Sequence, residues 1–397
     1  MTRTDAARSE RTAVVHAGVD RDPITGASSV PIYLASTYNQ DDPDRPGTYD
    51  YTRSGNPTRE ALEKAVAELE GAAGAFAFSS GMAAISSVLL LFQPGDHLVV
   101  SEDVYGGTYR VLTKLFAQWE LGVTFVDTTD PDRVAAAVTP ATRGLYIETP
   151  SNPLLRITDL GAMAAIAQKH GLVSIADGTF TTPYLQKPLA FGIDIVVHSA
   201  TKFLNGHSDV LAGLAAVRTP ELAKRLKFVQ NAFGAVLGVQ DAWLLLRGMK
   251  TLAVRLDAEQ RTAEAVATAL GDIPDIARVY YPALERHIGR EVHLRQARGG
   301  GAVLSFEFED AIMARLFLKH VQLPLVAVSL GGVESILTYP ITMSHAAMPR
   351  EERERRGITG ALVRLSVGLE SAADLLADIR RAISEAKRSL STMDYQI

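Results

Sequence analysis

The sequence has 397 residues and no cysteine. Disulfide bonds, thiolate nucleophiles and cysteine-ligated metals are therefore excluded. Long hydrophobic runs are also missing: the longest, such as residues 88–92, are far too short to cross a bilayer. The first residues, MTRTDAARSERTAVVHAG, are polar and lack the apolar core of a signal peptide. These absences predict a soluble, cytoplasmic protein.

An excess of charge of one sign is missing as well. The 40 Lys and Arg residues are balanced by 45 Asp and Glu, for a net charge of -5, and no long run of either sign occurs. Nucleic-acid binding would need a basic stripe, so neither a nucleic acid nor a membrane is expected as a partner. The composition is that of an ordinary globular protein, with 47% hydrophobic and 21% charged residues and a large buried core.

At about 150 residues per domain, the length predicts two or three domains. Residues 1–57 are rich in Pro, Gly, Asp, Ser and Thr and show no sustained apolar period. We predict that they form an extended N-terminal arm that contacts a neighbouring subunit. Residues 58–250 are expected to form a large domain, and residues 251–397 a smaller C-terminal α/β domain.

The first helix of the large domain is expected to begin at Thr58, which caps helices well, and to stop at Gly71. Glu60 and Lys64 add an i,i+4 pair on its exposed side.

Short apolar runs then alternate with amphipathic stretches. Strands that alternate with helices need crossover connections, which predicts a mostly parallel sheet covered by helices on both faces. Ligands of such sheets bind beyond the carboxyl ends of the strands. The expected strands are residues 75–78, 97–100, 123–127, 144–148, 172–177, 193–198 and 211–217. Helices are expected at residues 80–92, 107–119 and 159–170. Nearer the C-terminus, we expect a helical stretch at 236–256 and strands at 302–308, 325–329 and 362–367.

Chemically useful residues follow three of the predicted strands. Small residues from Ser79 to Ile85 open a helix whose N–H groups and dipole would bind phosphate, although a tight strand-to-helix turn has the same composition. Asp177 ends a later strand, where aspartate often caps a helix. Lys202 follows the next strand, 202 − 177 = 25 positions on, where a lone lysine is ordinarily solvated. Together, a phosphate site, a lysine nucleophile and a buried carboxylate are what pyridoxal phosphate (PLP) requires.

From about residue 12 to residue 370 the chain resembles the Cys/Met-metabolism family of PLP enzymes. The motifs that carry this resemblance are Tyr51–Arg59, Ser80–Met82, Glu102–Gly107, Glu148–Pro153, His198–Lys202 and Ser329–Ser335. The resemblance implies an aspartate-aminotransferase-like fold (PLP fold type I) and a homotetramer built from two tight dimers. It implies that Lys202 attaches PLP covalently and acts as the catalytic base, and that Asp177 pairs with the pyridinium nitrogen. Tyr105 would stack on the ring and take part in catalysis.

The same resemblance implies further binding residues, and no metal is expected. The phosphate would be held within one subunit by Gly81, Met82, Ser199 and Thr201. The phosphate of the neighbouring subunit would be reached by Tyr51 and Arg53. The carboxylate of an amino-acid substrate would be bound by Asn152, Ser329 and Arg364, the last through its two-pronged guanidinium.

Members of this family include β-lyases, γ-lyases, γ-synthases and O-acylhomoserine sulfhydrylases. Gly107 stands where methionine γ-lyases carry cysteine, which counts against methionine as the main substrate. Val328 stands where cystathionine γ-synthases and γ-lyases commonly carry glutamate, although methionine γ-lyases are also apolar there. Residues 230–238 and 343–349 look closest to Gram-positive-type cystathionine β-lyases. We therefore expect β-elimination of L-cystathionine to homocysteine, pyruvate and ammonia, with γ-elimination or γ-replacement as the alternative.

Gly178 departs from the family pattern, which usually has asparagine after the pyridine-binding aspartate. The missing amide would loosen the site, enlarge it for a different substrate, or be replaced by water. The residues alone leave these three alternatives open.

Two other functions compete with this prediction. A non-catalytic binding module of the same fold should have lost Lys202, Asp177 or Arg364, and all three are present. A metalloenzyme has no ligand pattern of recognisable spacing here, and the segment 207–209 is expected to be a structured turn near the lysine. The residues that such a metal site would use are His198, His207, Asp209 and His345.

Overall fold

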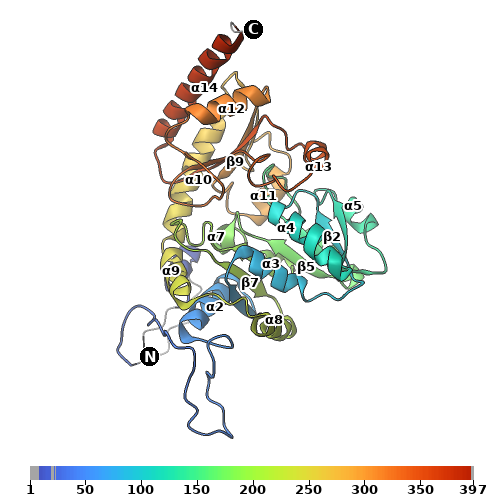
Figure 1. The fold of residues 1–397 in the computed structure, drawn as a ribbon, viewed down its shortest axis with the longest axis vertical. Helices are drawn as coiled ribbons and strands as arrows, with labels where there is room; N and C mark the ends of the chain where they lie inside the picture. The colour runs from blue at the N-terminus through green and yellow to red at the C-terminus, as the bar shows by residue number, and fades with distance from the viewer. Residues whose placement is uncertain (1–8, 19–21, 23, 395–397) are drawn as a thin grey trace.

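The structure, a computed structural model, describes residues 9–18, 22 and 24–394. Its larger part is a seven-stranded sheet with the order β1-β7-β6-β5-β4-β2-β3. Only β7 runs antiparallel to its neighbours in this sheet, and the remaining neighbouring strands pair in parallel. The predicted mostly parallel α/β fold is therefore confirmed (Figure 1). The strands are β1 (Gly74–Phe78), β2 (His97–Ser101), β3 (Gly122–Val126), β4 (Thr142–Glu148), β5 (Val173–Asp177), β6 (Ile195–Ser199) and β7 (Gly213–Val217).

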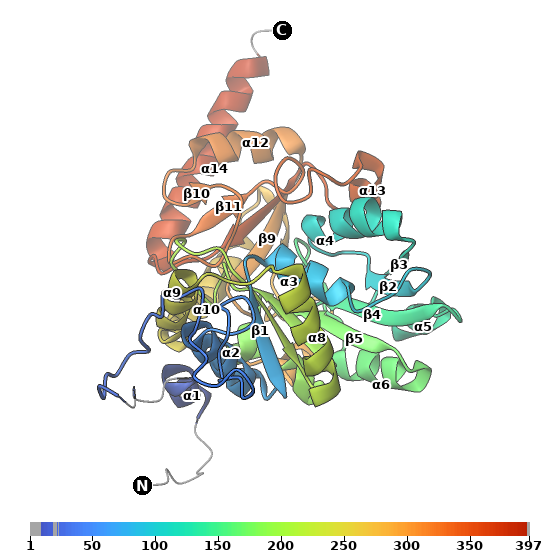
Figure 2. The same cartoon turned by 60° about the horizontal axis from the view of Figure 1, so that its bottom comes forward.

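Alternating side chains of the strands enter two separate apolar cores. On β1, Phe76 and Phe78 join the core under α3 and α8, whereas Ala75 and Ala77 join the core under α2 and α9. Both α2 and α8 therefore pack on this strand, from opposite sides (Figure 2). The helices of this part are α2 (Pro57–Glu70), α3 (Gly81–Leu89), α4 (Gly106–Arg110), α5 (Pro131–Ala136), α6 (Leu160–His170), α7 (Thr182–Leu185), α8 (Pro220–Phe233) and α9 (Val239–Met249).

The cap of helix α2 differs from the prediction. Asn56, not Thr58, is the N-cap, and its side-chain oxygen accepts the backbone N–H of Thr58 at 2.9 Å. The Thr58 hydroxyl instead donates to the carbonyl of Pro31 at 2.8 Å and holds the preceding segment. The predicted stop at Gly71, which has φ +67°, is confirmed. The predicted pair between Lys64 Nζ and Glu60 Oε1 forms at 2.8 Å.

Two further local predictions were incomplete. The region predicted as an extended arm contains a short helix, α1 (Glu10–His16), whose Val14 is buried in the core beside α2. The helix predicted at 107–119 is broken: α4 ends at Arg110, a π-helical turn spans Val111–Leu115, and a 3₁₀ turn spans Phe116–Trp119. Periodicity does not distinguish these helix types, because their apolar spacing is nearly the same over two turns.

A second, five-stranded sheet of order β10-β11-β12-β9-β8 occupies the C-terminal part. Helices α12 and α14 pack closely against each other over one core of this sheet (Figure 1). The helical stretch predicted at 236–256 is divided between α9 and α10, and the strand predicted at 325–329 is only two residues long. The elements are α10 (Leu252–Leu270), β8 (Ile276–Tyr280), α11 (Arg290–Gln296), β9 (Val303–Phe308), α12 (Ala311–His320), β10 (Leu325–Val326), β11 (Ile336–Thr338), α13 (Arg350–Arg355), β12 (Leu362–Ser366) and α14 (Ala372–Asp394).

None of the helices within residues 9–18, 22 and 24–394 combines the length and the apolar character that a membrane span requires.

Candidate active site

A cavity of about 470 Å³ lies beyond the carboxyl ends of β4, β5 and β6, where the topology of a parallel sheet predicts a ligand. One of its walls comes from the C-terminal part, through Val328–Leu330, Met343, Ser344, Ala346, Ala347 and Arg364. The predicted site residues that line this cavity are Gly81, Met82, Tyr105, Asn152, Asp177, Ser199, Thr201, Lys202, Ser329 and Arg364.

Lys202 lines this cavity, three residues beyond the end of β6. Its Nζ donates a hydrogen bond to Ser329 Oγ at 2.5 Å. Burial, and after it the positive charge of Arg364, lower the pKa of Lys202 to about 8. A pKa of about 8 leaves roughly a tenth of this amine neutral at pH 7, far more than for an exposed lysine. The amine is therefore prepared to act as a nucleophile or a base.

Asp177 ends β5, beside β6, as the sequence predicts for neighbouring strands. Its Oδ1 accepts hydrogen bonds from the backbone N–H and the hydroxyl of Thr179, at 3.0 and 2.5 Å. The Thr179 hydroxyl in turn accepts the backbone N–H of Ser199 at 2.9 Å, which ties the two strand ends together. Burial raises the pKa of Asp177 above its ordinary value. A cationic ring nitrogen next to this carboxylate would supply the opposite charge that favours its ionised form.

The start of α3 fits a phosphate group. Ser80 Oγ accepts the N–H of Ala83 at 3.0 Å, which leaves the N–H groups of Gly81 and Met82 outside the helix's own hydrogen bonds. A Cβ atom at Gly81 would lie 2.8 Å from that of Ser199, so glycine keeps this approach open. Helix N-termini of this kind bind phosphate. Together with Lys202 and Asp177, the described residues fit PLP.

Arg364 forms the opposite end of the cavity. This guanidinium is 2% exposed and donates to Asn152 Oδ1 at 2.9 Å, Ser329 O at 2.6 Å and Thr338 Oγ1 at 2.9 Å. Burial lowers the pKa of Arg364 to about 10, so it stays cationic at neutral pH. A buried guanidinium with an amide beside it is a natural site for a carboxylate.

Ser329 joins the lysine to the arginine. Its hydroxyl accepts from Lys202 and its carbonyl accepts from Arg364. Its backbone has φ +92°, a conformation that costs a non-glycine residue about 1–3 kcal/mol and that accumulates at functional sites.

Tyr105 presents its ring at the mouth of the cavity and is 40% exposed. A Cβ atom at Gly107 would lie 2.3 Å from the Tyr105 ring, so the ring occupies the space of any side chain at that position. Glycine at position 107 therefore leaves the room that this ring needs.

Tyr51 and Arg53 lie outside the cavity of their own chain. Both are on the segment before α2, where Arg53 Nε donates to Asn231 Oδ1 at 3.3 Å and the Tyr51 side chain is 44% exposed. Arg59, which is buried, donates from Nη2 to the carbonyls of Thr52 and Arg53 and thereby holds this segment. The predicted role of Tyr51 and Arg53 in a neighbouring subunit stays a prediction.

The geometry around Gly178 excludes an enlarged site. A Cβ atom there would lie 2.8 Å from Cε1 of His198 and 3.1 Å from Cγ2 of Val196. His198 is held by Glu70, with Nε2 and Oε1 at 2.6 Å. Because the His198 ring fills the space beside Gly178, the missing asparagine side chain leaves no hole.

The histidines weighed as metal ligands do not converge. His198 pairs with Glu70, the Nδ1 of His207 lies 2.7 Å from the carbonyl of Asn205, and burial lowers the pKa of His345 to about 4. Asp209 accepts from Asn205 Nδ2 at 2.8 Å, within the turn predicted for this segment. Among the described residues, no group of three or more His, Asp or Glu side chains is arranged to hold a metal ion.

Among the lining residues that were not predicted as site residues, Thr179, Glu148 and Arg110 carry polar side chains that could act in the site. Thr179 follows Asp177 by two residues, and Glu148 ends a predicted strand. Both could therefore have been found by the rule that identified Asp177, namely that ligands bind beyond the carboxyl ends of the strands. The Arg110 side chain makes no hydrogen bond or ion pair with the part of the chain that the structure describes. In the sequence, only its position five residues after Tyr105 indicated that it could lie near the predicted site.

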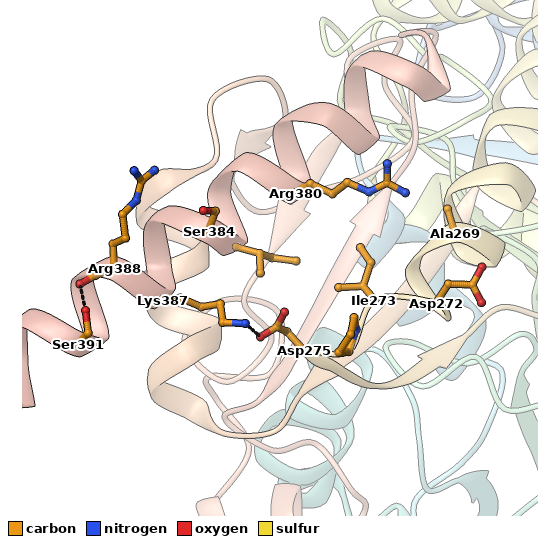
Figure 3. A pocket seen from close by; sticks show the side chains of 11 residues that line it. Ala269, Asp272, Ile273, Asp275, Arg380, Ser384, Lys387, Arg388 and Ser391 are labelled. Atoms are coloured by element: carbon orange, nitrogen blue, oxygen red, sulfur yellow. Dashed lines mark hydrogen bonds and ion pairs between the residues drawn. The ribbon is translucent and has the colours of Figure 1, made fainter.

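Another cavity, of about 690 Å³, lies between the end of α10 and α14 (Figure 3). Its residues include Asp275 and Lys387, whose carboxylate and amine pair at 2.8 Å, and Arg380 points along its upper side. None of the predicted site residues lines it. The cavity at Lys202 is therefore the candidate active site.

Comparisons with known proteins agree with this geometry. The family model described as Cys/Met metabolism PLP-dependent enzyme matches residues 11–384. Cystathionine beta-lyase MetC of Bacillus subtilis (strain 168) is 56% identical over 374 residues, which cover 94% of this chain and 96% of that protein. Cystathionine gamma-lyase of the same organism is 49% identical, with 94% and 99% covered. The crystal structure of cystathionine gamma-lyase from Lactobacillus plantarum complexed with L-serine has a TM-score of 0.94 at 45% identity, covering 96% of this chain and 100% of that chain.

Proposed function

We propose that this chain, which belongs to the Cys/Met metabolism family of PLP-dependent enzymes, is a carbon–sulfur lyase acting on L-cystathionine. The reaction is a β-elimination in which cystathionine and water give homocysteine, pyruvate and ammonia. The observation that carries the proposal is the Lys202–Ser329–Arg364 chain of contacts, which places an amine of lowered pKa next to a carboxylate-binding guanidinium.

When bound, PLP supplies an electron sink for negative charge that develops on the substrate α-carbon. Lys202, Asp177 and the start of α3 would hold it. Arg364 and Asn152 bind the carboxylate of the reacting amino acid and so orient its α-carbon toward Lys202. The neutral Lys202 amine accepts the α-proton, because its pKa of about 8 lies close to the working pH.

Arg110 supports a substrate with a second carboxylate. Cystathionine carries an amino and a carboxylate group at each end, and Arg364 can bind only one of the carboxylates. Arg110 lines the same cavity and has no partner among the described side chains. We infer that it binds the distal carboxylate. Val328, which is 61% exposed at the mouth, leaves that end without a competing acidic group.

The alternative reaction is γ-elimination or γ-replacement by the same residues. It is favoured by the 49% identity with a cystathionine gamma-lyase and by the fold shared with the gamma-lyase structure. The higher identity, 56%, with a cystathionine beta-lyase supports β-elimination.

We also infer a homotetramer in which each active site receives residues from a neighbour. The arm before α2 exposes apolar side chains: Ile32 is 43% exposed, Leu34 is 74% exposed and Tyr51 is 44% exposed. A second copy that covers this face would bring Tyr51 and Arg53 to the phosphate. The native mass of the purified protein tests this inference, and a monomer with full activity would contradict it.

The deciding experiment gives the purified, PLP-loaded protein L-cystathionine and identifies the keto acid and thiol released. Pyruvate with homocysteine supports the proposal, and oxobutyrate with cysteine assigns γ-elimination. Release of neither by a protein that binds PLP would refute the lyase, and O-acetyl- or O-succinylhomoserine with a thiol would then be tested. The Lys202→Ala variant controls for contaminating lyases.

A further inference from the structure

Glu148 makes two hydrogen bonds that nothing in the predicted site accounts for. It ends β4 and is 6% exposed. Its Oε2 accepts the backbone N–H of Tyr105 at 2.7 Å, and its Oε1 accepts the backbone N–H of Asn152 at 3.0 Å. Each oxygen of the carboxylate therefore serves a different segment of chain.

Both segments line the cavity, and each carries a different predicted site residue. Tyr105 precedes the first turn of α4 and carries the ring at the mouth. Asn152 accepts a hydrogen bond from Arg364 through its side-chain oxygen. The carboxylate of Glu148 thus connects the residue expected at the cofactor ring to the residues expected at the substrate carboxylate.

The position of this carboxylate is unfavourable for folding alone. Glu148 lies directly opposite Asp177 in the pairing of β4 with β5. Burial, and after it the charge of Asp177, raise the pKa of Glu148 well above its ordinary value. Two adjacent buried acidic side chains with no salt bridge to the described residues cost stability. Glutamine is neutral and nearly the same size, but it has one acceptor oxygen and so can satisfy only one of the two N–H groups.

We propose that Glu148 is a positioning residue that fixes the Tyr105 ring relative to the Asn152–Arg364 pair by holding both backbones. Glu148 acts through these residues and does not itself react. The inference rests on the proposed function only in assigning Tyr105 to the cofactor and Asn152 to the substrate. It holds for any amino-acid substrate.

The test compares Glu148→Gln with a control, Ser101→Ala, in the PLP-loaded enzyme. The Ser101 hydroxyl accepts the backbone N–H of Glu148 at 3.4 Å, so the control disturbs the same residue and leaves its carboxylate intact. Amide hydrogen exchange is measured for the peptides that contain Tyr105 and Asn152. The visible circular dichroism of the bound cofactor and the kcat/KM for the substrate that wild type cleaves complete the comparison.

For Glu148→Gln we expect faster exchange in at least one of the two peptides and a reduced cofactor dichroism. Leaving one of the two buried N–H groups without an acceptor should lower kcat/KM about 10- to 100-fold, mainly through kcat. Ser101→Ala should stay within about twofold of wild type in all three measurements. Exchange and dichroism are measured without substrate, so they decide the matter even if cystathionine is not cleaved.

Glu148→Asp is the second variant. It keeps the carboxyl group but is one methylene shorter and cannot reach both N–H groups, so the same losses are expected. Unchanged exchange and dichroism in either folded variant would overturn the proposal. Failure of both variants to fold would assign Glu148 to stability instead, and would overturn it as well.

Discussion

Removing the positive charge of Arg364 should slow the covalent capture of PLP by Lys202 at neutral pH. Only the neutral amine attacks the aldehyde carbon of PLP. Arg364 lowers the pKa of Lys202 because two nearby positive charges repel each other. The variant Arg364→Met should therefore raise that pKa and leave less neutral amine.

The magnitude follows from the causes of the lowered pKa. Burial and Arg364 together bring the pKa of Lys202 from 10.5 to about 8, and burial is the larger cause. The difference corresponds to roughly 300-fold in the neutral fraction at pH 7. Arg364 accounts for less than half of the lowering of this pKa, because burial is the larger cause. The variant should therefore hold about 3- to 10-fold less neutral amine than wild type. Above pH 10.5 the amine is neutral in both proteins, and the two rates should converge.

The assay follows the visible absorbance of apoprotein mixed with PLP between pH 6 and about 10.5. The acidic limb of the rate profile should move to higher pH in Arg364→Met. The control is Arg356→Met, which removes a buried arginine that does not contribute to the lowered pKa of Lys202. A limb that coincides with wild type, or moves to lower pH, would refute the electrostatic coupling between Arg364 and Lys202.

Three further outcomes are expected. Lys202→Ala should lose the visible absorbance of the covalently held cofactor and all turnover. The control Lys187→Ala, which breaks a pair with Glu10, should keep both. Turnover by Lys202→Ala would contradict the role of the lysine. Ser329→Gly should raise the unfolding free energy by about 1 kcal/mol, because glycine relieves the strain at φ +92°. Its kcat/KM should fall, because the hydroxyl is lost. Thermal unfolding that shows a less stable variant would refute the strain. Arg110→Gln should raise the KM for L-cystathionine about tenfold and leave that for S-methylcysteine unchanged, and equal effects on both would refute the distal-carboxylate site.

The amino-acid sequence by itself determined the parallel sheet and the place of its chemistry. Apolar runs that alternate with amphipathic stretches allow little else, because each crossover must return the chain to the same edge of the sheet. Asp177 and Lys202 therefore lie at neighbouring strand ends, as their positions predict. The end of α2 at Gly71, which has the left-handed conformation, was predicted for a local reason as well. At the other end of that helix, Asn56 and Thr58 are both good caps, and only the tertiary contact of Thr58 with Pro31 separated their roles.

Only the tertiary structure decided which distant residues meet in the cavity. Arg364 contacts Asn152 across 212 positions, and Ser329 reaches Lys202 across 127, through the packing of the C-terminal part on the large sheet. Periodicity and composition describe neighbours within about one helical turn, so they contain no information on such contacts. The same limit applies to Gly178, whose missing side chain is explained by the ring of His198 on the next strand. Which residues share one cavity is thus a property of how two sheets pack, and no local pattern encodes it.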